Sequence, residues 1–323
     1  MRLQDLFLTD STSLTLLNGQ YDAPLVALSL FVAILAGIMA FQLASMARDE
    51  QRVFHRQTYL LSGAFVLGSG VWSMHFIGML AFSVCSTAPY DKLITIMSML
   101  PSFIASWVAL LLIAKQRVTS WQLVISGISV GAGIGVMHYS GMAAVHKTLS
   151  LRFDPYIFAV SIVVAVVLSI LALWLRFKLD ANKIMSARGI DVLSGGVVGI
   201  AISGMHYTGM KATHFVANPN SLLEQTENLD IAWSIAGITT LAILITGAGN
   251  ALLRYRSIYQ RMVRTEARTR TIVDTAVDGI ITIDSRGIIR DFNAAAERIF
   301  GWQASEIIGK NIGVLMPEPQ RTL

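Results

Sequence analysis

Apolar residues form long uninterrupted stretches along this chain, and polar residues gather between them. A helix needs about 20 consecutive apolar residues to cross the hydrocarbon core of a bilayer. Seven segments meet this length without Asp, Glu, Lys or Arg, and they predict an all-α integral membrane bundle of seven transmembrane helices. The segments are 25–46, 59–84, 93–114, 121–145, 156–175, 192–210 and 231–253.

Basic residues between the predicted spans indicate their orientation, because cytoplasmic loops carry an excess of Lys and Arg. Such residues follow the first, third and fifth spans, whereas the alternate loops hold fewer. We therefore expect the N-terminus outside and the C-terminus in the cytoplasm. The basic residues of the three loops are Arg48, Arg52, Arg56, Lys115, Arg117, Arg176, Lys178, Lys183 and Arg188.

The composition supports a membrane protein, with 54% apolar residues, 14% charged residues and a mean hydropathy of +0.60. The net charge of +5 could suggest a nucleic-acid partner, but the basic residues lie in the loops as topology signals. We therefore expect no nucleic-acid partner. The single cysteine, Cys85, excludes an internal disulfide and a cysteine-based zinc cluster, and is at most an accessory ligand.

The second, fourth and sixth predicted spans carry one pattern near their C-terminal ends: Met, His, an aromatic residue, any residue, Gly, Met. The motif histidines are 63 and 68 residues apart, the length of two spans with their loops. This period predicts three copies of a helical hairpin with one helix left over, and three histidines at one depth toward the outer leaflet. The copies are Met74-His75-Phe76-Ile77-Gly78-Met79, Met137-His138-Tyr139-Ser140-Gly141-Met142 and Met205-His206-Tyr207-Thr208-Gly209-Met210.

Residues four apart on a helix lie about 40° apart around its axis, so each copy presents an imidazole and a thioether on one face. Ionisable residues inside spans are costly and usually functional, and we expect these histidines to be the only ones deep in the bundle. The predicted metal ligands are His75, Met79, His138, Met142, His206 and Met210. Candidate accessory ligands are Met74, Met137, Met205, His146 and His214.

Imidazole with thioether is a soft ligand set that favours copper, especially Cu(I), over hard cations. Three histidines alone could instead hold zinc, and a His/Met pair could be the axial ligands of a haem. For any single copy, an interhelical hydrogen bond for the histidine and gap filling for the methionines are the simpler interpretations. The threefold recurrence favours a ligand-binding role.

At these residues the chain resembles the MHYT family, named after the sequence present here as Met205-His206-Tyr207-Thr208. The other two copies depart from the name only at the aromatic and hydroxyl positions. The resemblance covers residues 1–253. It implies a sensor domain in the inner (cytoplasmic) membrane of a bacterium, proposed to bind copper and through it a diatomic gas such as oxygen, carbon monoxide or nitric oxide.

Residues 254–270 are strongly basic and predict a juxtamembrane linker helix against anionic lipid headgroups. A partial apolar stripe on this helix leaves two interpretations open, a solvated linker or the signalling helix of a homodimer. The stripe comprises Tyr255, Ile258, Met262 and Ile272.

Residues 271–323 predict the start of a soluble α+β domain: strand 279–283, a turn at 284–287, and strand 288–292. Asn293 should then cap a short helix that Gly301 ends, before another helix at 304–308. This order and the run Asp291-Phe292-Asn293-Ala294-Ala295 resemble the N-terminal part of a PAS domain. The ending Met316-Pro317-Glu318-Pro319 resembles haem-binding PAS domains of oxygen-sensing kinases. In those domains the haem-ligating histidine lies beyond the last residue of this chain, so these residues lend a haem no support.

A half PAS domain leaves a sheet edge uncovered, so we expect the parent protein to continue into an output module. In MHYT proteins this module is often a GGDEF and EAL pair that makes or degrades cyclic di-GMP. These residues contain no catalytic motif of their own. The sequence thus favours a membrane signal-input protein over the alternative of a copper transport or metal-handling protein, because no carboxylate lies within a predicted span to relay protons.

Overall fold

The computed structural model describes residues 7, 16–86, 90–115, 118–145, 149–182, 185–217 and 229–316. Seven helices in it are long and apolar enough to cross a membrane, which confirms the predicted spans. The chain falls into two units, Met1–Ala248 and Gly249–Leu323, and the long helix α9 runs through the boundary. The helices of the first unit are α1 Ala23–Asp49, α2 Val53–Leu80, α3 Ser83–Ser86, α4 Lys92–Met97, α5 Met99–Ile113, α6 Ser120–Met142, α7 Pro155–Asn182 and α8 Ala187–Ala212, and α9 Leu229–Thr275 is shared with the second unit.

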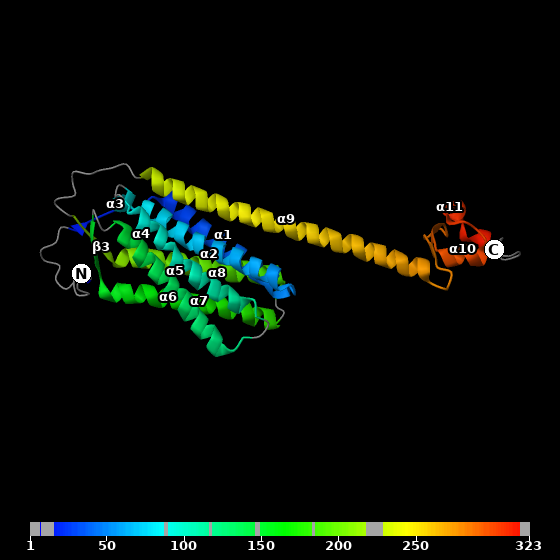
Figure 1. Cartoon of the computed structure of the whole chain (residues 1–323), viewed down its shortest axis with the longest axis horizontal. Coiled ribbons are helices and arrows are strands. Elements are labelled where there is room, and N and C mark those ends of the chain that lie inside the picture. Colours follow the sequence, from blue (N-terminus) through cyan, green and yellow to red (C-terminus); the bar gives the residue numbers. More distant parts are fainter. Residues whose placement is uncertain are drawn as a thin grey trace. The chain divides into compact units, whose positions relative to one another are not determined.

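Six helices form a closed ring in the order α1, α2, α5, α6, α7, α8, with α8 packed against α1. Figure 1 shows this bundle from the side. The motif-bearing helices α2, α6 and α8 also contact each other in pairs, so they line the axis of the bundle. This arrangement confirms the three predicted hairpins. Large apolar side chains such as Phe31, Ile104 and Val163 remain exposed on the outside, where lipid would cover them.

Glycines allow the hairpins to approach closely. A Cβ atom on Gly37 of α1 would overlap the carbonyl oxygen of Gly195 on α8, and one on Gly199 would overlap the backbone of Ile34. Without side chains at these positions the two backbones lie in direct contact. This contact closes the ring between the third hairpin and the first.

The third span is interrupted at Ser98, where α4 ends and α5 begins. Trp72 of α2 donates its indole N–H to the carbonyl of Thr95 at 2.9 Å and to the hydroxyl of Ser98 at 3.1 Å. One turn further along α5, the hydroxyl of Ser102 donates to the carbonyl of Gly68 at 3.0 Å. Hydrogen bonds therefore fix this broken span against α2.

A small antiparallel sheet, which the sequence did not predict, lies at the end of the bundle that α2, α6 and α8 reach with their C-termini. It has the order β1 Leu16–Leu17, β3 Thr213–Ala217, β2 Leu149–Phe153, and we refer to this end as the sheet end. Leu151, Phe153 and Phe215 from the sheet are buried in one cluster with Met79, Met142 and Met210. The strands therefore cover the ends of the motif helices.

One expectation about charge is wrong: ionisable residues other than the histidines are buried in the bundle. Arg176, assigned from the sequence to a loop, lies inside α7 with no exposed surface, and Asp191 of α8 is 3% exposed. The Nε atom of Arg176 lies 3.1 Å from the Oδ1 atom of Asp191. Ser45 of α1 accepts a hydrogen bond from Arg176 at 3.0 Å and donates one to Asp191 at 2.8 Å. The fifth predicted span ends at residue 175, whereas the helix continues past it to Asn182.

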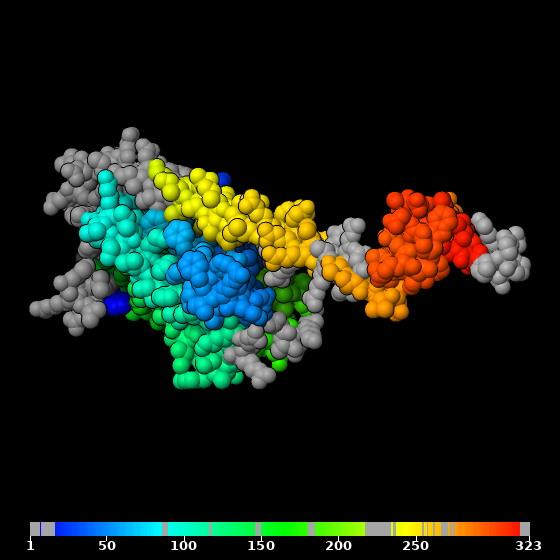
Figure 2. Space-filling view, turned by 45° about the vertical axis from the view of Figure 1, so that its right-hand side comes forward, coloured from blue at the N-terminus to red at the C-terminus, as the bar shows by residue number. Residues whose placement is uncertain are grey.

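The N-terminal part of α9 packs on the outside of the ring. Ile243 is buried in a cluster with Val32 and Ala36 of α1 and with Val66 and Ile77 of α2. Figure 2 shows this part of α9, in yellow, lying over the helices drawn in blue to cyan. Because Ile77 lies two residues after His75, this cluster connects a motif-bearing helix to α9.

The second unit begins within α9 and contains the predicted hairpin and short helices. Its elements are β4 Ile281–Ile283, β5 Ile289–Phe292, α10 Ala294–Phe300, α11 Ala304–Ile307 and the 3₁₀ helix η3 Ile312–Leu315. Asn293 caps α10, as predicted, and Gly301 ends it in the left-handed region at φ 73°.

Asn293 also connects the hairpin to the last turn of α9. Its Oδ1 atom accepts hydrogen bonds from the N–H groups of Ile280 (2.9 Å) and Ala296 (2.8 Å). Its Nδ2 group donates to the carbonyls of Val273 (2.8 Å) and Asp278 (3.1 Å). One buried side chain thus bonds to α9, to the segment after α9, and to α10.

Candidate metal centre

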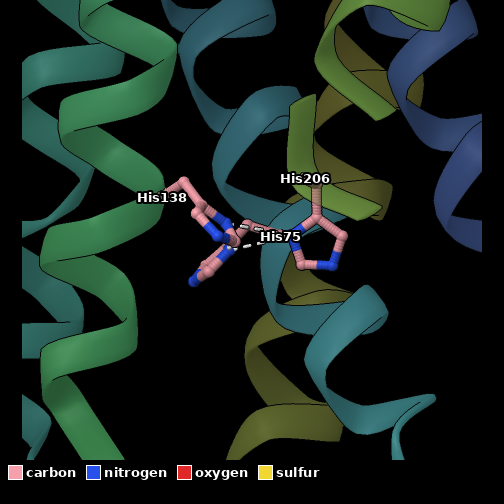
Figure 3. Close-up of side chains that lie close together, drawn as sticks. All are labelled: His75, His138 and His206. Carbon is pink, nitrogen blue, oxygen red and sulfur yellow. Dashed lines mark hydrogen bonds between the residues drawn. The ribbon is translucent and has the colours of Figure 1, made fainter. Parts of the chain in front are cut away.

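The three motif histidines converge on the axis of the bundle. His75 from α2, His138 from α6 and His206 from α8 are each at most 1% exposed. Their Nδ1 atoms form a triangle with sides of 3.1 Å (His75 to His138), 3.2 Å (His138 to His206) and 3.2 Å (His206 to His75) (Figure 3). Each pair of rings meets edge to face, at interplanar angles of 84° to 86°. The rings come together because the three histidines lie at one depth in the bundle, as the sequence predicts.

Hydrogen bonds among the rings cannot satisfy this triangle. The Nδ1 atom of a neutral imidazole is either a donor or an acceptor. With three atoms in mutual contact, at least one of the three contacts must therefore join two donors or two acceptors. A cation at the centre removes the conflict, because it accepts a lone pair from all three nitrogens.

The dimensions of the triangle fit a metal ion. His75, His138 and His206 each offer one ring nitrogen as a potential ligand atom. Among the described residues, these three atoms lie within 4.8 Å of one another. A metal at about 2.0 Å from three nitrogens in a trigonal arrangement separates them by about 3.5 Å. The observed 3.1–3.2 Å is a few tenths shorter, so a small outward movement of each ring admits the ion.

A glycine of a neighbouring hairpin accommodates the far edge of each ring. A Cβ atom on Gly141 would overlap Nε2 of His75, one on Gly209 would overlap Nε2 of His138, and one on Gly78 would overlap Nε2 of His206. The three Nε2 atoms are buried and have no hydrogen-bond partner in the described part of the chain. The motif glycine, present in all three copies, therefore makes room for the histidine of another copy. The sequence showed its recurrence but not this role.

The six methionines of the motif fall into two buried clusters. Met79, Met142 and Met210 belong to the buried cluster at the sheet end. The candidate accessory residues Met74, Met137 and Met205 belong instead to the main core cluster of the bundle. The histidine nitrogens thus form the centre, with a set of three thioethers in each of the adjoining clusters.

Cys85 adds a fourth sulfur to the cluster at the sheet end, where it is fully buried. Burial raises the pKa of its thiol above the usual range, so the group is neutral at physiological pH. Cys85 thus adjoins the methionines of the motif, and its accessory ligand role stays a prediction.

The two tyrosines of the motif form hydrogen bonds to the outer helices, whereas the hydroxyls of Ser140 and Thr208 donate to carbonyls of their own helices. The hydroxyl of Tyr139 lies 2.8 Å from that of Ser161 on α7, and the hydroxyl of Tyr207 lies 2.7 Å from that of Ser29 on α1. Phe76, the corresponding residue of the first copy, packs against Trp72 and Tyr90. The two tyrosines therefore brace α6 against α7 and α8 against α1.

The two candidate accessory histidines have different outcomes. His146 lies outside the described residues. His214 lies in β3 opposite Arg152 of β2, partly exposed, and is not a member of the histidine group. Phe215, its neighbour in the strand, is the residue that faces the buried methionines.

Comparison with known proteins places this bundle in a family. The sequence profile of the MHYT family, described as a bacterial signalling protein N-terminal repeat, matches residues 68–126, 131–186 and 199–265. The chain belongs to the MHYT family. The profile of the PAS fold matches residues 267–323, directly after the MHYT repeats. This MHYT sensor is therefore followed by a PAS region, as the sequence predicted.

Several curated proteins are similar to the MHYT chain. The bifunctional diguanylate cyclase/cyclic di-GMP phosphodiesterase MucR of Pseudomonas aeruginosa is 36% identical over 262 residues, which are 80% of this chain and 36% of MucR. The cyclic di-GMP phosphodiesterase NbdA of the same organism is 32% identical over 233 residues, 71% of this chain and 29% of NbdA. The chain thus spans about a third of the length of these relatives.

The PAS region has a relative of its own. The sensor protein FixL of Bradyrhizobium diazoefficiens is 51% identical over 57 residues, which are 18% of this chain and 11% of FixL. No solved structure matches the chain.

Proposed function

We propose that this membrane signalling sensor binds copper at His75, His138 and His206, and that the metal or a diatomic gas bound to it is the signal. The observation that carries the proposal is the triangle of Nδ1 atoms, whose contacts hydrogen bonds cannot all satisfy. Cu(I) suits a site of few, soft ligands, and buried thioethers adjoin the histidine layer. When bound, copper would supply a centre that coordinates oxygen, carbon monoxide or nitric oxide.

The geometry favours a bare ion over a haem in the bundle. The centroids of the three imidazole rings are 4.9–5.2 Å apart. A porphyrin would have to lie between two imidazole rings that act as axial ligands, and it would extend well beyond them on each side. The close-packed core around the three histidines leaves no space for a group of this size. Zinc shares the three-nitrogen geometry and is the competing ion in the test below.

We infer that the signal leaves the bundle through α2 and α9. Ile77 lies on the helix that carries His75, and it packs in one cluster with Ile243 of α9. The same helix α9 ends at Thr275, where Asn293 bonds to the carbonyl of Val273. A displacement of α2 on ligand binding is therefore transmitted to the PAS region through packed side chains, helix α9 and the hydrogen bond of Asn293.

The names of the relatives support an output module in cis that follows the PAS region and acts in cyclic di-GMP signalling. The basic loops support an orientation with the N-terminus outside and the PAS region in the cytoplasm of a bacterial cell, in the inner membrane. Exposed apolar residues on the cytoplasmic half of α9, such as Tyr259 and Met262, support pairing of two copies through this helix.

Metal analysis of purified protein tests the copper proposal. We expect about one copper per chain in the wild-type protein loaded with Cu(I), and loss of most of it in each of His75→Ala, His138→Ala and His206→Ala. His55→Ala, at an exposed residue near the start of α2, is the matched control and should retain full copper. Unchanged copper in all three triad variants, or zinc in preference to copper, contradicts the proposal. Copper uptake into vesicles that depends on the triad would indicate transport instead.

A further inference from the structure

The six helices of the ring meet at three seams between neighbouring hairpins, in which a motif helix packs on the first helix of the next hairpin. The seams are α2 with α5, α6 with α7, and α8 with α1. Each motif helix carries a glycine seven residues before its histidine, and a Cβ atom on this glycine would overlap the backbone of a residue across the seam. The three seams therefore share one register. The pairs are Gly68 with Phe103, Gly131 with Val166 and Gly199 with Ile34.

The same register places one buried serine in each seam, five residues before the residue that packs on the glycine. The serines are Ser29 of α1, Ser98 at the start of α5 and Ser161 of α7, and each is at most 2% exposed. Each hydroxyl donates to the carbonyl three residues earlier in the chain, at 2.7 Å in all three cases. Because a hydroxyl has one proton to donate, each serine can only accept a hydrogen bond from the motif helix.

A tyrosine supplies the donor in two of the seams. Tyr139 and Tyr207 each follow a motif histidine directly in the sequence. The hydroxyl of Tyr139 lies 2.8 Å from that of Ser161, and the hydroxyl of Tyr207 lies 2.7 Å from that of Ser29. The tyrosines are therefore the donors of these two hydrogen bonds, and the serines are the acceptors.

The first seam has a different donor for its serine. Phe76 stands at the tyrosine position and has no hydroxyl. Trp72, one turn earlier on the same face of α2, donates its indole N–H to the hydroxyl of Ser98 at 3.1 Å and shares it with the carbonyl of Thr95 at 2.9 Å. The tryptophan thus replaces the missing hydroxyl. The residues that correspond to Trp72 in the two tyrosine copies are small: Gly135 and Ser203.

Each of these donors is connected to a motif imidazole through ring contacts. Tyr139 and Tyr207 meet the ring of the preceding histidine edge to face, with 4.8 Å between the centroids in both copies. Phe76 meets His75 in the same way at 5.0 Å, and Trp72 meets Phe76 at 4.9 Å. A path of direct contacts therefore leads from the serine of each seam to one histidine.

We propose that Ser29, Ser98 and Ser161 are positioning residues of the histidine centre. Each serine fixes an aromatic donor from the motif helix, and the aromatic rings fix the imidazole beside them. Trp72 is the positioning donor of the first repeat, as the tyrosines are in the other two. The inference rests on the proposed function for the purpose of the centre, and on the hydrogen bonds and ring contacts alone for the placement of the rings.

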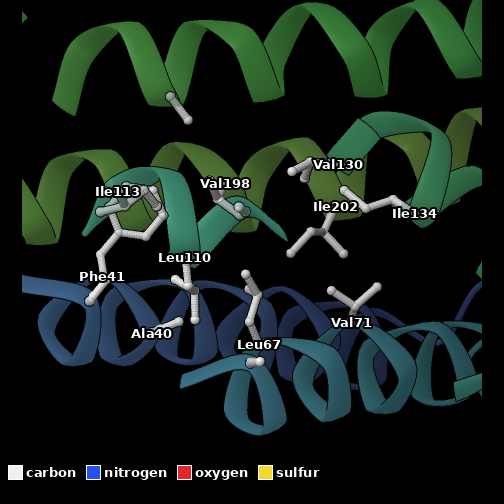
Figure 4. Packing of buried hydrophobic residues seen from close by; sticks show 14 of the residues in the cluster. Ala40, Phe41, Leu67, Val71, Leu110, Ile113, Val130, Ile134, Val198 and Ile202 are labelled. Atoms are coloured by element: carbon white, nitrogen blue, oxygen red, sulfur yellow. The ribbon is translucent and has the colours of Figure 1, made fainter. Parts of the chain in front are cut away.

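The surroundings increase the effect of these hydrogen bonds. Figure 4 shows Val71, Ile134 and Ile202, which lie one turn before the three motif histidines and belong to the apolar core that the seams enclose. A hydrogen bond is electrostatically stronger in such surroundings than in water. A buried donor that loses its serine there is left unsatisfied, so the loss should move the ring that carries or contacts it.

Transferring the pair of the third repeat into the first tests the proposal. Trp72→Ser removes the donor, and Trp72→Ser with Phe76→Tyr supplies a hydroxyl at the tyrosine position, which reproduces Ser203 and Tyr207. Adding Ser98→Ala to this double variant removes the acceptor while deleting a single oxygen atom. Side-chain ¹⁵N NMR of the histidines in chelator-treated protein in nanodiscs reports the ring positions, and Cu(I) affinity is measured separately by competition with a chelator.

We expect Trp72→Ser to shift the ring resonances of His75 and to lower Cu(I) affinity by about tenfold. The double variant should restore both properties, and the triple variant should lose them again. Ser29→Ala and Ser161→Ala should each shift the ring resonances of the histidine in their own seam. Ser129→Ala is the matched control, because it removes a partly exposed hydroxyl that donates to the carbonyl of Ile125 in its own helix.

Two results overturn the inference. One is a triple variant that equals the double variant, because the rescue would then not depend on the serine. The other is wild-type ring resonances in Ser29→Ala and Ser161→Ala, which remove one oxygen atom each and decide the question if Trp72→Ser does not fold. Absence of Cu(I) binding in the wild-type protein contradicts the proposed function alone, since the NMR measurement needs no metal.

Discussion

The Nε2 atom of His75 on α2 occupies the space that a Cβ atom on Gly141 of α6 would fill. The same relationship connects His138 to Gly209 and His206 to Gly78, so each imidazole is positioned by the next hairpin around the axis. Glycine at these positions is therefore required by the ring of another repeat and not by the local helix.

Gly141→Ala should displace the His75 ring and damage the metal site. An added methyl group in a packed core typically costs about 1–3 kcal/mol, and the ring can avoid it only by leaving the triangle. We expect Cu(I) affinity to fall by about tenfold or more, measured by competition with a chromophoric chelator. Gly196→Ala is the control, because a Cβ atom there meets nothing within 4 Å. Equal affinities in the two variants would show that the glycine does not position the ring.

Much of this site could be predicted from the sequence, because hydropathy and the repeated motif report on depth and direction. Three histidines on spans that run the same way must lie at one level, and the structure brings them together. The pairing of His75 with Gly141 could not be predicted, because it depends on how the hairpins are arranged around the axis. The short strands β2 and β3 are only five residues each and adjoin helices, so periodicity did not reveal them.

The buried pair of Arg176 and Asp191 was missed for a related reason: each residue stands just outside an apolar run. Asp191 lies 15 residues before His206, and Leu60 and Leu123 occupy the same position before His75 and His138. All three positions are buried. The third repeat therefore has a charge where the others have a leucine, and Arg176 neutralises it.

Removing one partner of this pair should destabilise the bundle. Asp191→Leu leaves a buried guanidinium without its carboxylate, which typically costs about 3–5 kcal/mol. The double variant Arg176→Met with Asp191→Leu should recover most of that loss, since it restores the apolar layer of the other repeats. Unfolding in mixed detergent micelles measures both changes. Additive losses in the double variant would contradict a direct interaction between the two side chains.

Ile243→Ala should uncouple α9 from the bundle while leaving the metal site intact. The substitution removes the side chain that packs beside Ile77, and it lies far from the histidine nitrogens in the sequence and on another helix. We expect Cu(I) loading to alter amide hydrogen exchange along residues 249–275 in the wild-type protein and to have much less effect in this variant. Ile245→Ala, at a residue 62% exposed on the same helix, should behave as wild type. A full response in Ile243→Ala would exclude this cluster as the connection.

Asn293→Ala should loosen the junction between α9 and the PAS region. Its four hydrogen bonds satisfy backbone groups of Val273, Asp278, Ile280 and Ala296, and unmet buried groups cost about 1–3 kcal/mol each. Amide exchange in α10 and in the last turn of α9 should accelerate strongly. Arg298→Ala, at an exposed position of α10, provides the control. Unchanged exchange would mean that packing alone holds the junction.

The distribution of the three nitrogens over three hairpins also bears on how the protein is made. Each hairpin supplies one nitrogen and one glycine, and the glycine serves a different hairpin's imidazole. A chain in which one hairpin fails to insert, or inserts upside down, loses a nitrogen and the bracing of another ring at once. Metal retention at the proposed site would then show that all six helices have entered the bilayer in the correct orientation.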